Sequence, residues 1–161
     1  MRTLNAAGIP QPDLNRIVRF LTFQFSHLNC LVELTSDPDP QAPNAAFMTG
    51  DAYPDGGWLR GHKERDYVRI YVPTLTRPYP VTQQNPARGS CPVMTLTSWK
   101  DELLVVWAHE LQHITQYAEA RAVGRSVREV TDDREEKFEV DAEQTAWGAT
   151  LYASATKWKI Y

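Results

Sequence analysis

One long helix, predicted from about Trp99 to Val123, places the strongest constraint on the fold of this chain. Ser98 is a typical helix N-cap, and Asp101 three residues later strengthens the start signal. Gly124 is a residue type that often ends a helix. Apolar residues recur at helical spacing and predict a buried stripe along this helix: Leu103, Trp107, Leu111, Ile114 and Ala118.

Two histidines in the middle of this helix form a pattern that is typical of metal ligands. His109 and His113 are four residues apart, so both imidazoles lie on one helix face, about one turn from each other. Glu110 would stand beside them, next to the place of a metal-bound water. Neither histidine belongs to the apolar stripe, which favours a metal site over the alternative of two surface histidines on an amphipathic helix.

A zinc site of this kind needs a third protein ligand and leaves the fourth position open for water. No histidine follows His113, so a ligand from the later part of the chain must be a carboxylate. A final helix, predicted from about residue 131 or 132 to residue 157, supplies the candidates Glu139, Asp141 and Glu143. The first and the last of these share one face, whereas Asp141 points elsewhere. Small residues along one side of this helix allow close packing against a neighbouring helix: Ala142, Ala146, Ala149 and Ala153. Phe138 lies on the same side.

These two helices resemble the short gluzincin metallopeptidases through HELQHITQ and through Glu139-Val140-Asp141-Ala142-Glu143, with Ala146-Trp147-Gly148 just beyond. Those families combine HExxH, often HExxHxxQ, with a downstream ExxAD whose Glu is the third zinc ligand. The resemblance covers about residues 98 to 150. It implies a zincin-like fold that holds one Zn²⁺ ion by His109, His113 and Glu139. It also implies that Glu110 is the general base in the hydrolysis of a peptide bond.

The chain departs from this pattern at Glu143, where the families carry an aspartate that helps to orient a histidine ligand. The resemblance implies the same role for Glu143, with a longer reach. Peptide hydrolysis also needs a donor for the developing oxyanion, and four side chains are candidates: Tyr117, Tyr71, Arg69 and His62. We expect Gln116 to pack or to hydrogen-bond near the junction of the two helices.

The first half of the chain predicts a small mixed or antiparallel sheet with one helix against it. Residues 1–12 indicate an irregular lead-in, and Asp13 would cap a helix that ends near Phe25. Strands are predicted at residues 31–35, 45–49 and 66–72, with turn signals at Gly50-Asp51. The last strand alternates strictly, which is typical of a sheet with one wet face. The resemblance implies that this strand is the sheet edge that binds an extended peptide.

Residues 73–97 form a long connection with five prolines between this sheet and the first long helix: Pro73, Pro78, Pro80, Pro86 and Pro92. Connections of this length inside a domain are usually functional or disordered. The position directly before the HExxH helix favours a wall or flap over the site, and the alternative is a connection without a function.

Composition limits the number of domains and the classes of partner. A chain of 161 residues predicts a single domain, and 42% hydrophobic with 23% charged residues is typical of a soluble globular protein. A net charge of −3 gives no support for a nucleic-acid partner, and no apolar run predicts a membrane span. No secretory signal is seen, so we expect a cytoplasmic protein with reduced thiols at Cys30 and Cys91, a bridge between the two being the alternative.

Two other functions remain open. A deformylase-like metal hydrolase would need Cys91 as a ligand, because it is the only thiol near the motif. A metal-stabilised binding protein would need no catalytic base, so Glu110 weighs against it. We therefore expect a single α+β domain over residues 1–161, in which a small sheet and a helix back two long helices that carry the metal. The expected partner is a peptide or protein substrate.

Overall fold

Four strands form the main sheet in the order β1-β2-β4-β3. They are β1 (Arg2–Asn5), β2 (Cys30–Thr35), β4 (Asp66–Tyr71) and β3 (Thr49–Tyr53). The first three run parallel, and β3 is antiparallel to β4, so the sheet is mixed as expected. The computed structural model describes residues 1–54, 66–83, 93–126 and 136–155.

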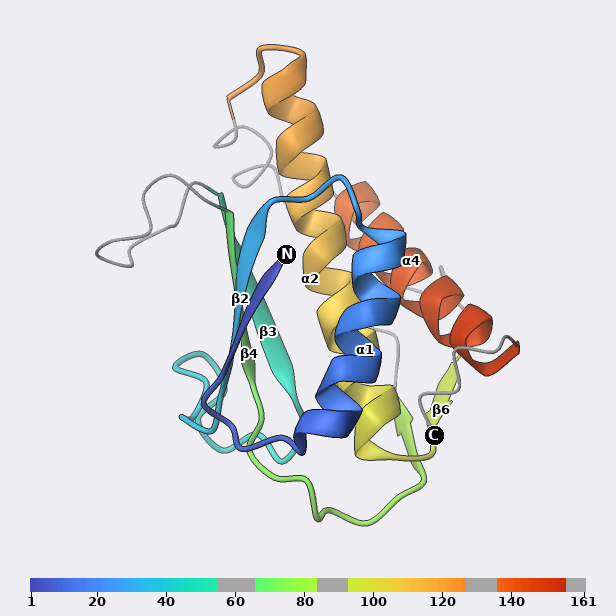
Figure 1. Cartoon of the computed structure of the whole chain (residues 1–161). Coiled ribbons are helices and arrows are strands. Elements are labelled where there is room, and N and C mark those ends of the chain that lie inside the picture. The colour runs from blue at the N-terminus through green and yellow to red at the C-terminus, as the bar shows by residue number, and fades with distance from the viewer. Residues whose placement is uncertain (55–65, 84–92, 127–135, 156–161) are drawn as a thin grey trace.

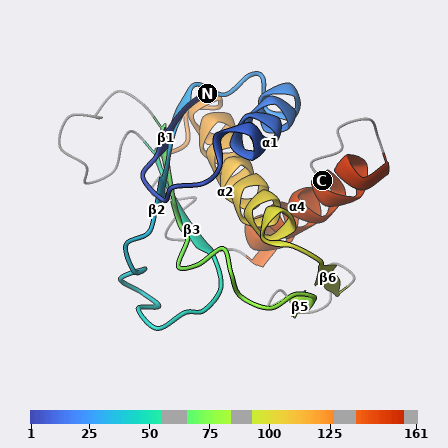
Figure 2. The same ribbon diagram turned by 60° about the horizontal axis from the view of Figure 1, so that its bottom comes forward.

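The described part of the chain contains three helices, α1 (Gln11–Gln24), α2 (Trp99–Ala122) and α4 (Glu136–Ala155), which makes the fold α+β. Figures 1 and 2 show that α1 and α2 lie on the same side of the sheet and that α2 lies between the sheet and α4. The core fills the space between α1, α2 and the inner face of the sheet. Its members with 0% exposed surface include Ile17, Phe20, Leu34, Val68, Ile70, Trp107 and Leu111.

The ends of α2 follow the sequence prediction closely. The Ser98 hydroxyl accepts a hydrogen bond from the Asp101 N–H at 3.3 Å, and Asp101 Oδ2 accepts one from the Ser98 N–H at 3.1 Å. This reciprocal capping box satisfies two of the free N–H groups at the start of the helix. Gly124 follows the helix with a φ of 73°, in the left-handed region that glycine tolerates best. The predicted stripe is buried except at Ala118, which is only half-buried.

The last helix also packs as predicted, through small residues. Ala142, Ala146, Ala149 and Ala153 are all buried, with at most 3% of their surface exposed. Small side chains let α4 approach α2 closely along its length. The predicted start of this helix at residue 131 or 132 and its predicted end at residue 157 lie outside the described residues.

The start of the chain differs from the prediction, because residues 2–5 form β1 rather than an irregular lead-in. This strand pairs in parallel with β2, from Arg2 beside Leu31 to Asn5 beside Leu34. Helix α1 begins at Gln11, with a proline in its first turn, where a missing N–H is harmless. Asp13 therefore lies inside the first turn and is not the N-cap.

Strand β3 covers residues 49–53, not the predicted 45–49, so Gly50 and Asp51 lie within a strand rather than in a turn. The predicted sheet edge is wrong as well, because β4 lies between β2 and β3. Strands β1 and β3 are the two edges of this sheet, and β3 is the one beside β4. The outer face of β4 is also less wet than expected, since Tyr67 and Tyr71 have only 2% and 4% of their surface exposed.

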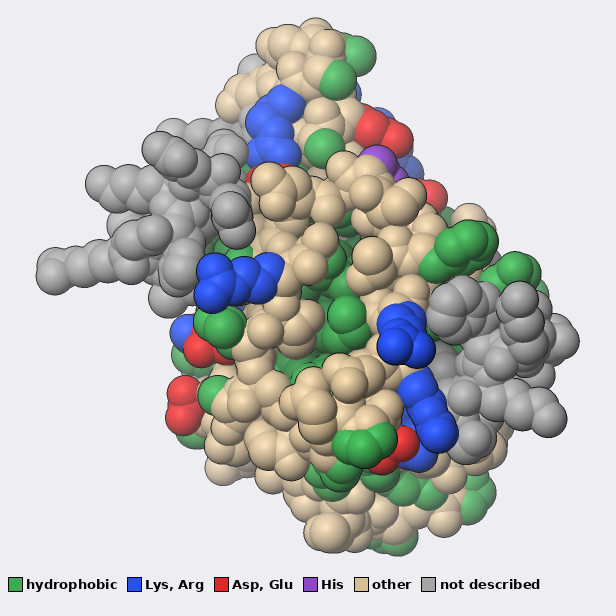
Figure 3. Space-filling model, viewed as in Figure 1, with side chains coloured by type: hydrophobic (Ala, Val, Ile, Leu, Met, Phe, Trp, Pro, Cys, Tyr) green, Lys and Arg blue, Asp and Glu red, His purple; other side chains and the backbone are tan. Residues whose placement is uncertain are grey.

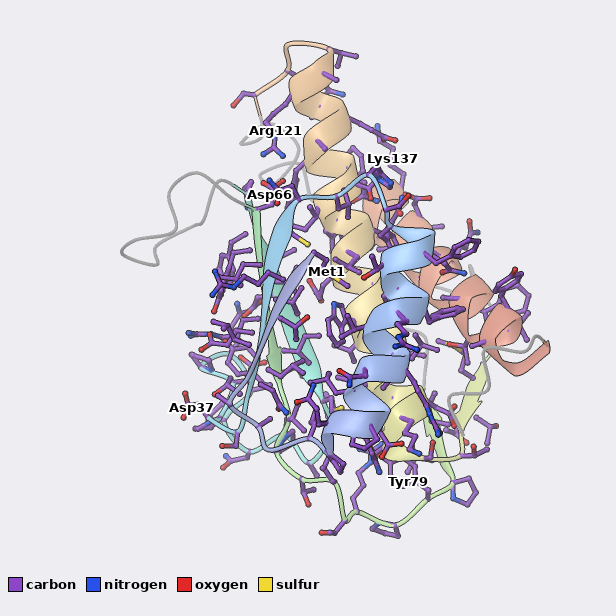
Figure 4. All side chains as sticks on the ribbon, viewed as in Figure 1. Met1, Asp37, Asp66, Tyr79, Arg121 and Lys137 are labelled. Atoms are coloured by element: carbon purple, nitrogen blue, oxygen red, sulfur yellow. The ribbon has the colours of Figure 1, made fainter. Side chains whose placement is uncertain are left out.

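The described residues of the 73–97 segment lie beside the first turns of α2, and they include two short paired strands, β5 (Val81–Gln83) and β6 (Met94–Leu96). The buried Glu102 fastens this segment, because it accepts a hydrogen bond from the Tyr79 hydroxyl and lies 3.3 Å from Arg77 Nε. Figure 4 shows Tyr79 at this end of the molecule.

The opposite end of α2 is tied to the sheet by an ion pair. Two nitrogens of Arg121 donate to the two carboxylate oxygens of Asp66 at 2.9 and 2.6 Å, and Figure 4 shows the two side chains facing each other. Basic and acidic side chains are interspersed over the face seen in Figure 3. None of the described helices has the length and apolarity that a membrane crossing would require.

Candidate metal centre

Three candidate metal ligands converge where α4 crosses the middle of α2. The Nε2 atoms of His109 and His113 lie 3.0 Å apart. One carboxylate oxygen of Glu139 lies 3.5 Å from His109 Nε2, and the other lies 3.6 Å from His113 Nε2. One ligand atom from each residue can be chosen so that all three lie within 4.8 Å of one another.

The spacing of these atoms fits a single zinc ion. Zinc bonds of about 2.0–2.1 Å in a tetrahedron place neighbouring ligand atoms about 3.3 Å apart. The three separations, 3.0, 3.5 and 3.6 Å, lie close to that value, although the last two involve different oxygens of Glu139. In the metal-free protein one imidazole nitrogen can donate a hydrogen bond to the other, and with both lone pairs free the two nitrogens suit a metal ion.

The local folding explains how these residues meet. The buried side of α2 fixes the rotation of the helix, so that the face with His109 and His113 turns toward α4. Ala142, with 0% of its surface exposed, lies one turn after Glu139 and lets the two helix backbones come close. A bulky residue there would move the Glu139 carboxylate away from the imidazoles.

The charges around the site favour a cation. Burial alone would lower the pKa of His109, but the carboxylates of Glu139, Glu110 and Glu143 raise it above its usual value. Burial and the nearby His109 lower the pKa of His113. Three acidic side chains therefore lie near one imidazole, and their negative charge favours a cation at this place.

Glu110 lies beside the ligands and faces a pocket. Only 7% of its surface is exposed, and burial raises the pKa of its carboxyl to about 7, partly offset by His109. The side chain lies against Gly50 of β3, where an added Cβ would lie only 2.6 Å from Glu110 Cγ. The absence of a side chain at Gly50 therefore makes the room that Glu110 occupies.

The pocket has a volume of about 390 Å³ and lies between β3, α2 and α4. Its walls are β3 from Gly50 to Tyr53, the histidine face of α2, and Phe138 with Glu139 on α4. No described residue of the 73–97 segment lines this pocket, and residues 84–92 lie outside the described part of the chain, so the predicted wall stays a prediction. Gly50, which the sequence analysis took for a turn residue, has the reason for its missing side chain in the distant Glu110.

A buried amide joins the two helices beside His113, as predicted for Gln116. Its Oε1 atom lies 2.9 Å from His113 Nδ1, and its Nε2 atom donates to the Phe138 carbonyl at 3.0 Å. The same Nε2 donates to Asp141 Oδ2 at 2.8 Å, and Gln112 Nε2 donates to that oxygen at 2.7 Å. Asp141, expected to point elsewhere, thus faces α2, because α4 lies along α2 and more than one of its faces meets that helix.

The predicted supporting residues have different positions. Tyr117 lines the pocket, and its ring stacks on that of His113 with centroids 6.5 Å apart. Glu143 is near enough to raise the pKa of His109, and its orienting role stays a prediction. Tyr71 does not line the pocket, although it lies near Asp51 and Tyr53, which do. Tyr53, which the sequence did not suggest, lines the pocket instead.

The other candidates lie elsewhere. Arg69 is held on the outer sheet face by Glu33, with Nε and Nη2 both 2.8 Å from Oε2. His62 and Cys91 lie outside the described residues, and with them the alternatives of a cysteine ligand and of a bridge to Cys30.

Comparisons of the chain with protein-family models, with curated proteins and with solved structures gave no match.

Proposed function

We propose that this protein is a zinc-dependent peptidase with a zincin-like site, in which His109, His113 and Glu139 hold the metal. The observation that carries the proposal is the convergence of these three side chains at separations of 3.0, 3.5 and 3.6 Å, at the side of a pocket. Three protein ligands leave a fourth position for water or substrate, as in catalytic zinc sites.

The chemistry assigns one role to the metal and another to Glu110. A bound zinc ion supplies Lewis acidity, which activates a water molecule and polarises the carbonyl of the substrate. Glu110 takes a proton from the attacking water and passes it to the amine that leaves when the C–N bond breaks. Burial of the Glu110 carboxyl raises its pKa in the metal-free protein, which favours exchange of a proton over a permanent charge.

The pocket suits an extended peptide. Strand β3 forms one wall, and its outer edge pairs with no strand in the described part of the chain. A substrate backbone can add to this edge by β-strand pairing, with its scissile bond near Glu110. Strand β3 thus takes the role that the sequence assigned to residues 66–72. Tyr117 is the candidate donor to the oxyanion, since it is the predicted one that lines the pocket.

A non-proteolytic binding protein is the main alternative. Structural zinc sites are usually closed by four protein ligands and need no adjacent base. The buried Glu110 carboxylate beside an open pocket therefore favours catalysis. The deformylase-like alternative depends on Cys91 and gains no support from the described residues.

Metal analysis of the purified protein tests the ligand assignment. We expect one zinc per chain in the wild type and loss of zinc in Glu139→Gln. The matched control is Glu119→Gln, which removes the same charge from an exposed position of α2 and should retain the metal. Retention of zinc in Glu139→Gln would overturn the assignment of Glu139. Loss of zinc in Cys91→Ser instead would favour the deformylase-like alternative.

Cleavage of a mixed peptide library tests the activity. We expect the zinc-loaded wild type to cut peptides and a chelator to stop the reaction. A protein that binds zinc stoichiometrically but cuts no peptide would be a binding protein, and the proposed activity would be wrong.

A further inference from the structure

We infer that Gln116 is a positioning residue that fixes the tautomer of His113, so that its Nε2 atom presents a lone pair to the metal centre. The inference rests on the proposed function in one respect: the lone pair on His113 Nε2 would bind the proposed metal. The hydrogen-bond pattern itself is independent of any metal, and it involves the buried junction of α2 and α4.

The orientation of the Gln116 amide is set by the Phe138 carbonyl. A carbonyl oxygen can only accept a hydrogen bond, so the group 3.0 Å from it must be the amide NH₂ of Gln116. The same nitrogen lies 2.8 Å from Asp141 Oδ2, a second acceptor. Rotation of the amide by half a turn would place its oxygen against both acceptors. Because Gln116 has only 5% of its surface exposed, water could not compensate for this loss.

The amide orientation then decides which imidazole nitrogen carries the hydrogen. With its nitrogen turned to α4, Gln116 presents Oε1 to His113 Nδ1 at 2.9 Å. An amide oxygen cannot donate, so Nδ1 must be the donor. A neutral imidazole has one hydrogen, and Nε2 is therefore left with a lone pair. This Nε2 is the atom 3.0 Å from His109 Nε2 and 3.6 Å from Glu139.

Asp141 supports this arrangement from α4. Its Oδ2 atom accepts from Gln116 and from Gln112, which lie one helical turn apart on α2. The carboxylate therefore ties α4 to α2 two residues after Glu139. Of the two glutamines, Gln116 alone hydrogen-bonds the imidazole of His113, so Gln112 provides a matched control for the loss of one amide bond to Asp141.

The test compares Gln116→Met with Gln112→Met. The ring nitrogens of His113 are observed by NMR in the metal-free protein at about pH 8, where imidazoles are mostly neutral. We expect the Nδ1–H tautomer in the wild type and in Gln112→Met, and a mixture of tautomers in Gln116→Met. Zinc affinity, measured by competition with a chelator, should fall about 10- to 100-fold in Gln116→Met alone.

Thermal melting and the backbone amide spectrum detect a simple folding defect in Gln116→Met, since a folded variant should keep cooperative unfolding and the wild-type dispersion of amide signals. An Nε2–H tautomer in the wild type would overturn the inference, and so would equal tautomers and affinities in Gln116→Met and Gln112→Met.

The two measurements separate this inference from the proposed function. A wild type that shows the Nδ1–H tautomer but binds no zinc would refute the metal site and keep the role of Gln116. A wild type that binds zinc, with a His113 tautomer that does not change in Gln116→Met, would keep the metal site and refute the role of Gln116.

Discussion

Two glutamates on α2 are almost equally buried but have opposite surroundings. Glu102 has 3% of its surface exposed and accepts hydrogen bonds from the Met48 N–H, at 2.8 Å, and from the Tyr79 hydroxyl. Glu110 has 7% of its surface exposed, yet no described residue hydrogen-bonds its carboxylate. One carboxylate joins three segments of the chain, whereas the other has its oxygens open toward a pocket.

The difference shows that burial alone does not indicate what a carboxylate does. Glu33 extends the comparison to the sheet. Although burial would raise its pKa, hydrogen bonds from Tyr67 and Arg69 lower the pKa below its usual value. At Glu110 the same desolvation acts without such donors, and the pKa rises to about 7. The supply of hydrogen-bond donors therefore separates structural carboxylates from one that is able to exchange a proton.

The largest effect is expected for Glu110→Gln. Peptide cleavage should fall by about 10²–10⁴-fold, the usual contribution of a general base. Zinc content and the free energy of unfolding should not fall, because the carboxylate makes no hydrogen bond to a described residue. Peptide assays, metal analysis and thermal melting check these points together. Loss of stability without loss of activity would place Glu110 in the same class as Glu102.

For Glu102→Ala we expect a loss of stability instead of a direct loss of catalysis. Removal of a buried acid from its partners costs about 3–5 kcal/mol in the free energy of unfolding. Denaturant unfolding measures this loss, and Glu119→Ala, at an exposed position of the same helix, is the control. Wild-type stability in Glu102→Ala would contradict the structural role given to this carboxylate.

Gly50→Ala tests the contact between β3 and Glu110. The new Cβ would lie 2.6 Å from Glu110 Cγ, so the base must move. A displacement near 1 Å is able to reduce turnover by about 10²-fold. Gly148→Ala on α4 is the control, because no atom lies within 4 Å of its added Cβ. Steady-state kinetics of both variants show whether the room at Gly50 serves the reaction.

A small pH effect is expected from Glu33. Its pKa is lower in the folded than in the unfolded protein, so its stabilising effect is present above the unfolded pKa and is lost as the pH falls through the folded value. Because the Arg69–Glu33 pair is partly exposed, this contribution should be at most about 1 kcal/mol. The free energy of unfolding can be compared between wild type and Glu33→Gln from pH 7 to pH 3, a range that spans the usual glutamate pKa of about 4.3. The difference between the two proteins should become smaller as the pH falls.

The long helix was predictable because its signals are local. The N-cap at Ser98, the stop at Gly124 and the apolar spacing are each read from neighbouring residues, and the structure confirms them. The approach of Glu139 to the two histidines was suggested by a family resemblance. Its geometry agrees with that suggestion, while the zinc and the activity stay predictions.

The missed elements depend on distant partners. Strand β1 has few apolar residues and exists through its pairing with β2. Strand β3 contains Gly50 and Asp51, which are typical of turns, and the reason for a glycine there is a side chain on α2. The bond from Gln116 to Asp141 depends on how α4 lies against α2, and residue spacing within one helix does not determine that arrangement.

The alanines that bring α4 close to α2 have a further consequence. Such small side chains remove little apolar surface from water, so α4 gains less from the hydrophobic effect than α1 or α2. Its attachment must depend more on polar links, among them Asp141 and the proposed zinc ion at Glu139. We therefore expect amide hydrogen exchange in α4 to speed up selectively when the metal is removed, while the core strands remain protected. The metal would then act as a reversible crosslink between two helices, and its loss would open the protein at one side only.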